Sequence, residues 1–248
     1  MSSTPRPARR RWRARRSRPL VLRGCFVTGT DTGVGKTVVA AAVAAGLAAA
    51  GTSVAAFKPA LTGADEPPDS GWPPDDELLA CVTGQRPHDV APRRFGPAVS
   101  PHLAAELAGS RLNPVDLLAD ARRAGAHTDV LVVEGVGGIL VPLALDYTVR
   151  DFACDLGLAV IVAARPGLGT INHTLLTLEA LRAADLDVAG VVLTPWSRKP
   201  SRLESSNRDT IAGLGQVDVE MLPRVRSPTV PALAAAGAAL PLRRWVLA

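Results

Sequence analysis

A glycine-rich turn within residues 26–42, FVTGTDTGVGKTVVAAA, holds the residue types that bind phosphate. An apolar run precedes the turn, and Lys36 and Thr37 open an alanine-rich stretch after it. In a P-loop the backbone N–H groups surround the phosphates, the lysine reaches the β- and γ-phosphates, and the threonine hydroxyl binds Mg²⁺. The strict spacing is not met, because Thr30 stands at the first glycine position and Gly29 lies one residue earlier. The turn still predicts binding of a nucleoside triphosphate with Mg²⁺, although it does not define a reaction.

Carboxylates that could complete a metal site stand at two further places. Glu134 ends the apolar run VLVVE and is followed by the glycine-rich sequence GVGG. Ligands bind at the carboxyl ends of parallel strands, and Mg²⁺ prefers hard oxygen ligands, so Glu134 is a candidate. Asp75 and Asp76 follow a proline-rich segment, and they either cap a helix that begins near Glu77 or add one metal ligand. The residues alone leave open which of the two aspartates would bind.

Lys58 is one of three lysines in a chain whose lysines and arginines together number 28. It ends an apolar run in the sequence FKPALTG, which predicts that it lies at the same sheet edge as Lys36 and Glu134. An ammonium group is a compact charge on a flexible stem, whereas a guanidinium is a planar fork. We therefore predict that Lys58 acts at the phosphate site rather than as an ordinary surface residue. Thr62 follows four residues later with a hydroxyl group for hydrogen bonding.

Bringing these groups to one edge requires a parallel sheet, and the chain has the pattern of one. Apolar, β-branched runs predict strands at 21–28, 53–58, 130–134, 158–164, 188–194 and 217–222. Alanine- and leucine-rich segments predict helices at 35–50, 114–124, 149–156, 169–184 and 203–214. The alternation indicates an α/β fold of the P-loop NTPase type, a doubly wound and mainly parallel sheet with helices on both faces. Segments 63–75 and 85–100 are proline-rich and irregular, and after Pro231 we expect a helix and then an edge strand at 244–247.

Composition indicates a globular protein, with 47% hydrophobic and 21% charged residues in a chain of 248. We expect one P-loop α/β domain over residues 21–248 and a disordered arginine-rich tail over residues 1–20. Nine arginines in residues 1–23 account for the net charge of +5, and such a tail could instead bind nucleic acid or an anionic surface. No run approaches the ~20 apolar residues of a membrane helix. We therefore expect no membrane partner. The three cysteines are widely spaced, which fits a reducing compartment, so we expect a cytoplasmic protein.

Five motifs together resemble the dethiobiotin synthetase family, in order and in spacing. They are GTDTGVGKT (29–37), KPALTG (58–63), SPH (100–102), VEGVGGILVPL (133–143) and GTINHTLLTLEAL (169–181), and SNR (206–208) is similar to some members. The resemblance spans roughly residues 22–225, and the displaced first glycine of the P-loop is typical of that family. It implies an enzyme that uses ATP and Mg²⁺ to join CO₂ to 7,8-diaminopelargonic acid and to close a ureido ring. The implied intermediates are a carbamate and a carbamic-phosphoric anhydride.

The resemblance also implies roles for individual residues. The nucleotide site would consist of Gly33, Val34, Gly35, Lys36, Thr37, Val38, Asp75, Glu134, Gly135, Val136, Gly137, Thr194, Pro195, Pro223, Arg224 and Val225. The Mg²⁺ ligands would be Thr37, Asp75 and Glu134, and the catalytic residues Lys58 and Lys36. The substrate would be bound by Thr62 and, from the neighbouring subunit of a homodimer, by Gly169, Thr170, Ile171 and Asn172. Thr194 stands where the family often has asparagine, which leaves the preferred base open.

Two other classes of P-loop protein are weighed against this family. A partitioning-type switch ATPase could use the arginine tail as a nucleic-acid or membrane arm, but such proteins carry a second lysine early in the P-loop. Residues 30–32 are Thr, Asp and Thr instead, so we expect no nucleic-acid partner. A corrinoid amide synthetase would bring a glutaminase domain with a Cys-His pair, for which the chain has no room.

Overall fold

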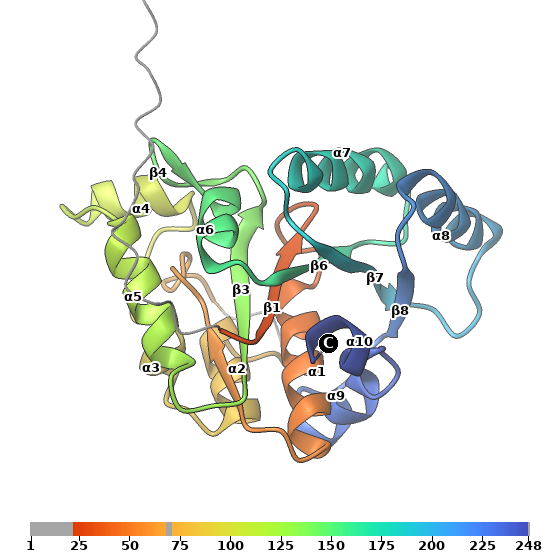
Figure 1. Ribbon diagram of the computed structural model, residues 1–248, viewed down its shortest axis with the longest axis horizontal. Coiled ribbons are helices and arrows are strands. Elements are labelled where there is room, and N and C mark those ends of the chain that lie inside the picture. Colours follow the sequence, from red (N-terminus) through yellow and green to blue (C-terminus); the bar gives the residue numbers. More distant parts are fainter. Residues whose placement is uncertain (1–21, 68–70, 248) are drawn as a thin grey trace, which may run out of the picture.

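The computed structural model describes residues 22–67 and 71–247, and Figure 1 shows a central sheet between two layers of helices. The predicted tail over residues 1–20 lies outside the described residues, and the single domain over 21–248 stays a prediction. The sheet has six strands in the order β2-β3-β1-β6-β7-β8, and every pairing in it is parallel. Its strands are β1 (Gly24–Gly29), β2 (Val54–Phe57), β3 (Val130–Gly138), β6 (Ala159–Ala164), β7 (Val188–Trp196) and β8 (Val219–Pro223). The predicted fold class is confirmed.

Ten helices cover the sheet in the described part of the chain. Their bounds are α1 (Lys36–Ala49), α2 (Asp75–Thr83), α3 (Pro87–Val90), α4 (Pro101–Leu107), α5 (Pro114–Ala124), α6 (Val149–Leu156), α7 (Thr170–Arg182), α8 (Arg202–Gly215), α9 (Val230–Gly237) and α10 (Leu242–Val246). In Figure 1, α7 and α8 lie on one side of the sheet and α1, α9 and α10 on the other. This is the arrangement that parallel strands require, because their crossover helices must cover both faces.

Two buried apolar clusters, one for each face, hold the layers together. Along β1, Cys25 and Val27 belong to the cluster under α1, whereas Phe26 belongs to the cluster under α5, α6 and α7. The Phe26 ring meets the Phe152 ring of α6 edge to face, with the ring centroids 6.1 Å apart. Successive strand residues point to opposite faces, and both faces are buried, so the strands appear in the sequence as unbroken apolar runs.

The strand order sets the place of every group that the sequence singled out. β1 lies in the middle of the sheet, paired with β3 on one side and β6 on the other. Val27 is opposite Glu134 of β3, and Gly29 is opposite Ala163 of β6. β3 therefore enters the sheet between β1 and β2, both of which precede it in the chain. The turn after β1 thus meets the carboxyl ends of its two neighbours.

The predicted strands and helices are confirmed within a few residues, with one extension and three omissions. β3 continues to Gly138 instead of ending at residue 134. The sequence did not predict α3, α4, or the hairpin of β4 (Pro142–Ala144) and β5 (Tyr147–Thr148). These elements have two to seven residues, too few to show a period, and a proline opens both helices.

Two expectations are wrong. The edge strand at 244–247 is instead helix α10, which begins after Pro241 and buries Trp245 and Val246. The Trp245 ring occupies the space in front of Gly190 on β7, where a Cβ would lie 2.2 Å from the ring. The segment therefore packs across a face of the sheet and does not extend its edge.

The aspartates before residue 77 do not cap a helix. α2 begins at Asp75 itself, Pro74 holds the N-cap position, and no side chain caps the helix. Asp75 and Asp76 lie in the first turn, where their charges favour the positive end of the helix dipole without accepting the capping hydrogen bond. Their carboxylates are thereby free to bind elsewhere.

Membrane crossing has no candidate in the described residues. None of the helices between 22 and 67 or between 71 and 247 combines the length and the apolar character that a bilayer requires.

Candidate functional site

The P-loop turn joins β1 to α1 at the carboxyl edge of the sheet. Gly35 holds the N-cap of α1 with φ at 93°, in the left-handed region that glycine adopts without strain. A Cβ at Gly35 would lie 2.8 Å from Thr194 Cγ2, so this position also needs the absence of a side chain. Thr30 N donates a hydrogen bond to Ala163 O at 3.1 Å, which ties the turn to β6. The loop is thus a fixed cradle at the start of a helix, the arrangement that binds phosphate.

Lys36 lies on the inner side of this cradle. Its Nζ donates to Asp31 O at 2.8 Å, and only 7% of the residue is exposed. Burial lowers the pKa of the Lys36 ammonium, although the nearby carboxylate of Glu134 acts in the opposite direction. A bound anion would reverse that effect, because an opposite charge favours the protonated amine.

Three oxygen-bearing side chains converge beside the cradle. Thr37 Oγ1 lies 2.8 Å from Asp75 Oδ1 and 2.9 Å from Glu134 Oε1, so its single proton can be donated to either carboxylate. Thr37 comes from α1, Asp75 from α2 and Glu134 from β3. The contact between Thr37 and Glu134 joins residues 97 positions apart in the sequence.

Lys58 lies between the two carboxylates. Its Nζ is 2.7 Å from Asp75 Oδ2 and 2.7 Å from Glu134 Oε1, and its side chain is 5% exposed. Burial opposes the ammonium charge, but Asp75 and Glu134 outweigh it and raise the pKa of Lys58. We call Lys36, Thr37, Lys58, Asp75 and Glu134 the cation cluster.

The two carboxylates of the cation cluster respond differently to their surroundings. Burial raises the pKa of Glu134, which is 1% exposed, against the effect of Lys58. Burial also acts to raise the pKa of Asp75, but the charge and hydrogen bond of Lys58 outweigh it and lower that pKa. Asp75, with 42% of its side chain exposed, is the carboxylate at the mouth of the site.

The donor set of the cation cluster fits a hard divalent cation. Two carboxylates and a hydroxyl converge, and Glu134 Oε2 is buried without a hydrogen-bond partner among the described residues. These residues contain no group of three or more His, Cys, Asp or Glu placed to hold a metal. One or two carboxylates suffice for Mg²⁺ when phosphate oxygens and water complete the shell.

The segment after Glu134 runs along the P-loop. A Cβ on Gly137 would lie 2.8 Å from Val141 Cγ2 and 3.7 Å from Thr32 Oγ1. Gly135 packs against Phe26, where a Cβ would lie 3.1 Å from the ring. Of the predicted site residues, Gly137 therefore lies beside the P-loop, whereas Gly135 faces the core cluster against which Val136 also packs.

The predicted base-binding residues meet at the carboxyl ends of β7 and β8. Trp196 is paired with Pro223, and Arg224 N donates to Trp196 O at 3.3 Å. Thr194 is buried against Gly35, which connects this place to the P-loop. Thr194, Pro195, Pro223 and Arg224 are thus brought together beside the cradle, and the side chain of Val225 packs against the core cluster under α1.

The predicted substrate residues lie on two other segments, one after β2 and one at the start of α7. Thr62 follows Leu61, which forms a backbone bridge with Arg94. Gly169 holds the N-cap of α7 with φ at 87°, Thr170 is buried and Asn172 is exposed. No hydrogen bond within the described residues joins Thr62 or Gly169–Asn172 to the cation cluster.

Two residues that the sequence did not assign to the site contact the P-loop or the segment that follows β6. Arg165, directly after β6, donates from Nη2 to Thr32 O at 3.1 Å. Asn207, within the SNR motif, donates from Nδ2 to Pro166 O at 2.9 Å and Gly167 O at 3.0 Å. The position of Arg165 at the end of an apolar run was one available signal. For Asn207 the SNR motif was the signal, although its two carbonyl partners lie 41 and 40 residues away.

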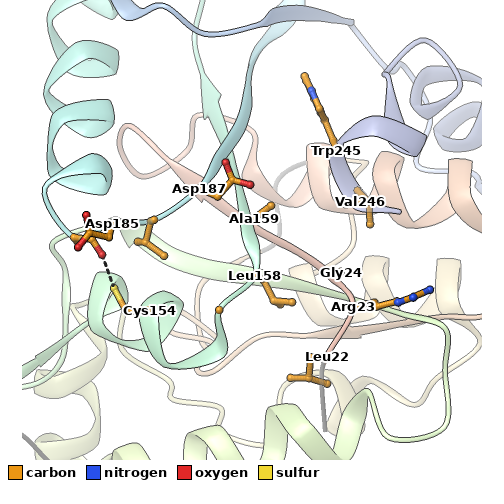
Figure 2. A pocket seen from close by; sticks show the side chains of 13 residues that line it. Leu22, Arg23, Gly24, Cys154, Leu158, Ala159, Asp185, Asp187, Trp245 and Val246 are labelled. Atoms are coloured by element: carbon orange, nitrogen blue, oxygen red, sulfur yellow. Dashed lines mark hydrogen bonds between the residues drawn. The ribbon is translucent and has the colours of Figure 1, made fainter. Parts of the chain in front are cut away.

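A cavity of about 470 Å³ lies at the amino ends of β1 and β6, as Figure 2 shows. Leu22, Arg23, Leu158, Asp187 and Trp245 are among its lining residues. The P-loop follows the carboxyl end of β1, so this cavity is at the other edge of the sheet. It is therefore not part of the phosphate site.

Comparison with known proteins gives two kinds of similarity. The family model described as "AAA domain" matches residues 23–229. An ATP-dependent dethiobiotin synthetase BioD from Anaeromyxobacter sp. (strain Fw109-5) is 44% identical over 175 residues, 69% of this chain and 76% of that protein. The protein of the same name from Mycobacterium sp. (strain KMS) is 43% identical over 198 residues, 77% of this chain and 83% of that protein.

Two solved structures share the fold at low sequence identity. The cell division ATPase MinD of Pyrococcus furiosus has a TM-score of 0.53 and 17% identity, covering 90% of this chain and 98% of that one. Cobyrinic acid a,c-diamide synthase of Mycobacterium smegmatis has a TM-score of 0.52 and 20% identity, covering 91% and 96%. Both support the P-loop NTPase architecture and nothing more specific.

Proposed function

This chain belongs to the ATP-dependent dethiobiotin synthetase family, and from that premise we propose how its own residues close the ureido ring. The family is one of ATP-dependent cyclo-ligases of biotin biosynthesis, so the chain is an enzyme that binds a nucleotide. We propose 7,8-diaminopelargonic acid, CO₂ and ATP as its substrates. The observation that carries the proposal is the buried Lys58 ammonium between Asp75 and Glu134, beside Thr37 of the P-loop.

The triphosphate is bound by the P-loop. The backbone N–H groups of Gly33 to Val38 face the phosphates at the start of α1, where the helix dipole also favours negative charge. Lys36, which now donates to Asp31 O, turns its ammonium to the β- and γ-phosphates. Exchange of the neutral carbonyl for anionic phosphate oxygens strengthens its hydrogen bonds, because both partners then carry charge.

Thr37, Asp75 and Glu134 hold Mg²⁺ in this proposal. Their oxygens already converge, and Glu134 Oε2 lacks another partner in the described residues. Asp75 is the ligand in preference to Asp76, whose carboxylate binds Arg94 instead. Mg²⁺ supplies positive charge against the phosphate oxygens as the transferred phosphoryl group moves.

The reaction needs no nucleophilic side chain. A neutral amine of the diamine attacks CO₂, a C–N bond forms, and the amine loses a proton to leave a carbamate. A carbamate oxygen attacks the γ-phosphorus, and ADP leaves. The second amine then attacks the carbonyl carbon of the mixed anhydride, and phosphate leaves with closure of the ring.

Lys58 makes the second step possible because an anionic carbamate must approach an anionic triphosphate. The carboxylates of Asp75 and Glu134 raise the pKa of Lys58, so it stays protonated at neutral pH. It acts as a fixed positive charge and hydrogen-bond donor, not as a base. Such preorganised charge in a buried site is the main source of catalysis in phosphoryl transfer.

A second copy of the chain completes the substrate site. The start of α7, Gly169 to Asn172, is a helix N-terminus, where the helix dipole suits the distal carboxylate of the diamine. Leu168 is 92% exposed and Leu145 is 90% exposed, unusual for large apolar side chains. We assign these leucines to a homodimer interface that places α7 of one protomer beside the cation cluster of the other.

The nucleotide base is read mainly through the backbone at Pro195 and Pro223 to Val225. Thr194 is buried and directs its methyl group toward Gly35. Unlike an asparagine at this position, it has no side-chain amide that could bind the base. We therefore expect more than one nucleoside triphosphate to support the reaction. A panel of four triphosphates at equal concentration tests this, and a strict requirement for ATP would contradict it.

The function as a whole is tested by phosphate release from the purified protein. Bicarbonate, Mg²⁺, ATP and 7,8-diaminopelargonic acid are omitted one at a time, and the product is identified by mass spectrometry. We expect release only in the complete mixture, with a cyclic urea as product. We also propose that the enzyme acts in the cytoplasm. Release that ignores the diamine and responds to DNA or lipid vesicles would overturn the proposal in favour of a switch ATPase.

A further inference from the structure

An ion pair joins Asp76, the neighbour of Asp75 in the chain, to Arg94, whose side chain is 36% exposed. Asp76 is fully buried, and its Oδ2 accepts a hydrogen bond from Arg94 Nη1. The other carboxylate oxygen, Oδ1, has no hydrogen-bond partner among the described residues. A charge in this position is costly to bury unless its partner is held in place. The proposed reaction uses Asp75 but assigns nothing to Asp76 or Arg94.

Arg94 belongs to a segment that fixes the backbone carrying Lys58. Lys58 N donates to Val90 O at 2.8 Å, which is the first of these bonds. Leu61 N donates to Arg93 O at 2.9 Å, and Phe95 N donates back to Leu61 O at 2.8 Å. The two stretches therefore run together like paired strands, and Arg94 lies at the bridge opposite Leu61.

Asp76 belongs to the first turn of α2, next to Asp75. Consecutive helical residues point about 100° apart, so the two carboxylates face different neighbours. Asp75 faces Thr37 and Lys58, whereas Asp76 faces Arg94. Pro74 provides no side-chain cap, so the charged contacts of this turn fix its rotation, Asp76 with Arg94 and Asp75 with Lys58.

We propose that Asp76 and Arg94 are positioning residues that set Asp75 and Lys58 in register with each other. The ion pair joins the start of α2 to the segment that holds Lys58. A turn of α2 about its own axis would move Asp75 away from Thr37 and Lys58 and would also break the bond of the buried Asp76 carboxylate to Arg94. Because Asp76 is fully buried, its directional bond to Arg94 selects one arrangement of the cluster, even where it adds little net stability.

The next residue along the chain provides a matched control. Arg93 Nη1 binds Asp120 Oδ2 of α5, and the two side chains are 23% and 14% exposed. This pair comes from the same segment and is of the same chemical kind. It joins that segment to α5, whereas the Asp76–Arg94 pair joins it to α2. The Arg93–Asp120 pair therefore controls for the loss of an ion pair from this segment. Of the two pairs, only the Arg94–Asp76 pair links the segment to the helix turn that carries Asp75.

The test compares Asp76→Asn with Asp120→Asn in the full chain, and it rests on the proposed function. Titration calorimetry measures Mg²⁺ binding in the presence of a non-hydrolysable ATP analogue, and steady-state kinetics give kcat and KM. We expect Asp76→Asn to weaken Mg²⁺ binding about 10-fold or more, the usual effect of removing a group that orients a ligand. Asp120→Asn should leave it within about 2-fold. Arg94→Lys, which retains a charge, should weaken Mg²⁺ binding less than Asp76→Asn does.

Each outcome decides the matter. Equal Mg²⁺ affinities of the two Asn variants, or a lower Tm for Asp76→Asn with unchanged Mg²⁺ binding, would overturn the positioning role. If Asp76→Asn does not fold, Arg94→Lys against Arg93→Lys gives the same comparison, and equal affinities again overturn it. A wild-type chain that binds Mg²⁺ and ATP analogue but makes no ureido product contradicts the proposed function instead, and the calorimetric comparison still stands.

Discussion

The carboxyl edge of the sheet carries two regions built in different ways. The cation cluster is made of side chains from α1, α2, β3 and the end of β2, and Lys58 and Glu134 within it are buried. The start of α7, by contrast, is a helix N-terminus next to Leu168, which is 92% exposed. The residues of the first region contact one another within a single chain, whereas the second region has an exposed apolar side chain beside it. The difference shows why we assign the phosphate chemistry to one protomer and the end of the substrate to its neighbour.

Replacement of Lys58 should have the largest effect. Lys58→Met removes the charge between Asp75 and Glu134 while keeping the length of the side chain. We expect kcat/KM to fall about 10³-fold or more, the range seen when a phosphate-neutralising cation is lost. Burial already raises the pKa of Glu134, so the glutamate can take up a proton and the fold can survive.

Lys199→Met is the matched control for this change, since Lys199 is an exposed lysine outside the cluster. It should keep wild-type kinetics, and circular dichroism should show that both variants are folded. Activity of Lys58→Met within about 10-fold of wild type would remove this lysine from the mechanism and weaken the contrast between the two regions.

Replacement of Thr37 should have the next largest effect, and it tests the cluster through the metal. Thr37→Val keeps the shape and removes the oxygen that meets Asp75 and Glu134. We expect kcat to fall about 10²-fold and the Mg²⁺ concentration for half-maximal rate to rise. Thr37→Ser, which retains the hydroxyl, should stay close to wild type, and equal behaviour of Val and Ser would contradict the ligand role.

A charge at Leu168 tests whether the α7 region needs a partner. Leu168→Asp should weaken the homodimer, because burial of an unpaired carboxylate at an apolar interface is unfavourable. We expect a monomer by sedimentation, and a specific activity that falls tens of times at nanomolar protein. Leu214→Asp, on an exposed leucine of α8, serves as control. A Leu168→Asp dimer with full activity would show that α7 is not the interface.

A methyl group at Gly169 should have the smallest effect. Gly169 has φ at 87°, and a Cβ there would meet only His173 at 3.9 Å, so the cost of alanine is mainly backbone strain of about 1 kcal/mol. We expect a several-fold increase in KM for the diamine and no change in KM for ATP. A change confined to ATP would place α7 with the nucleotide and merge the two regions.

The cation cluster was accessible to sequence reasoning because each member ends an apolar run or opens a helix, although β3 itself continues past Glu134 to Gly138. Glu134 follows four apolar residues, and Lys58 follows a shorter run, so the sheet rule placed both at one edge. The choice between Asp75 and Asp76 was not accessible, since it depends on helix rotation and on Arg94, a partner 18 residues away. The SNR motif contains Asn207, but the carbonyl partners of that residue could not be predicted, because tertiary contacts leave no periodic signal.

The end of the chain misled the sequence argument for a physical reason. Residues 244–247 have a strand-like composition, yet the sheet already ends at β8 and Trp245 finds a space in front of Gly190. A single glycine on a buried strand thus determined whether the segment paired at an edge or packed on a face. Local propensity decides such a segment less than the space available to its largest side chain.

The position of β3 also governs when the active site can exist. β3 enters between two strands made earlier, and Thr37 meets Glu134 only across 97 intervening positions. The entropy cost of closing so long a loop comes before the contact gives any stabilisation. This order slows the folding of such topologies. During synthesis the first 130 or so residues therefore leave β1 and β2 without the strand that joins them. In the proposed mechanism a chain without β3 lacks Glu134, so we expect ATP-dependent activity only after the sheet has closed.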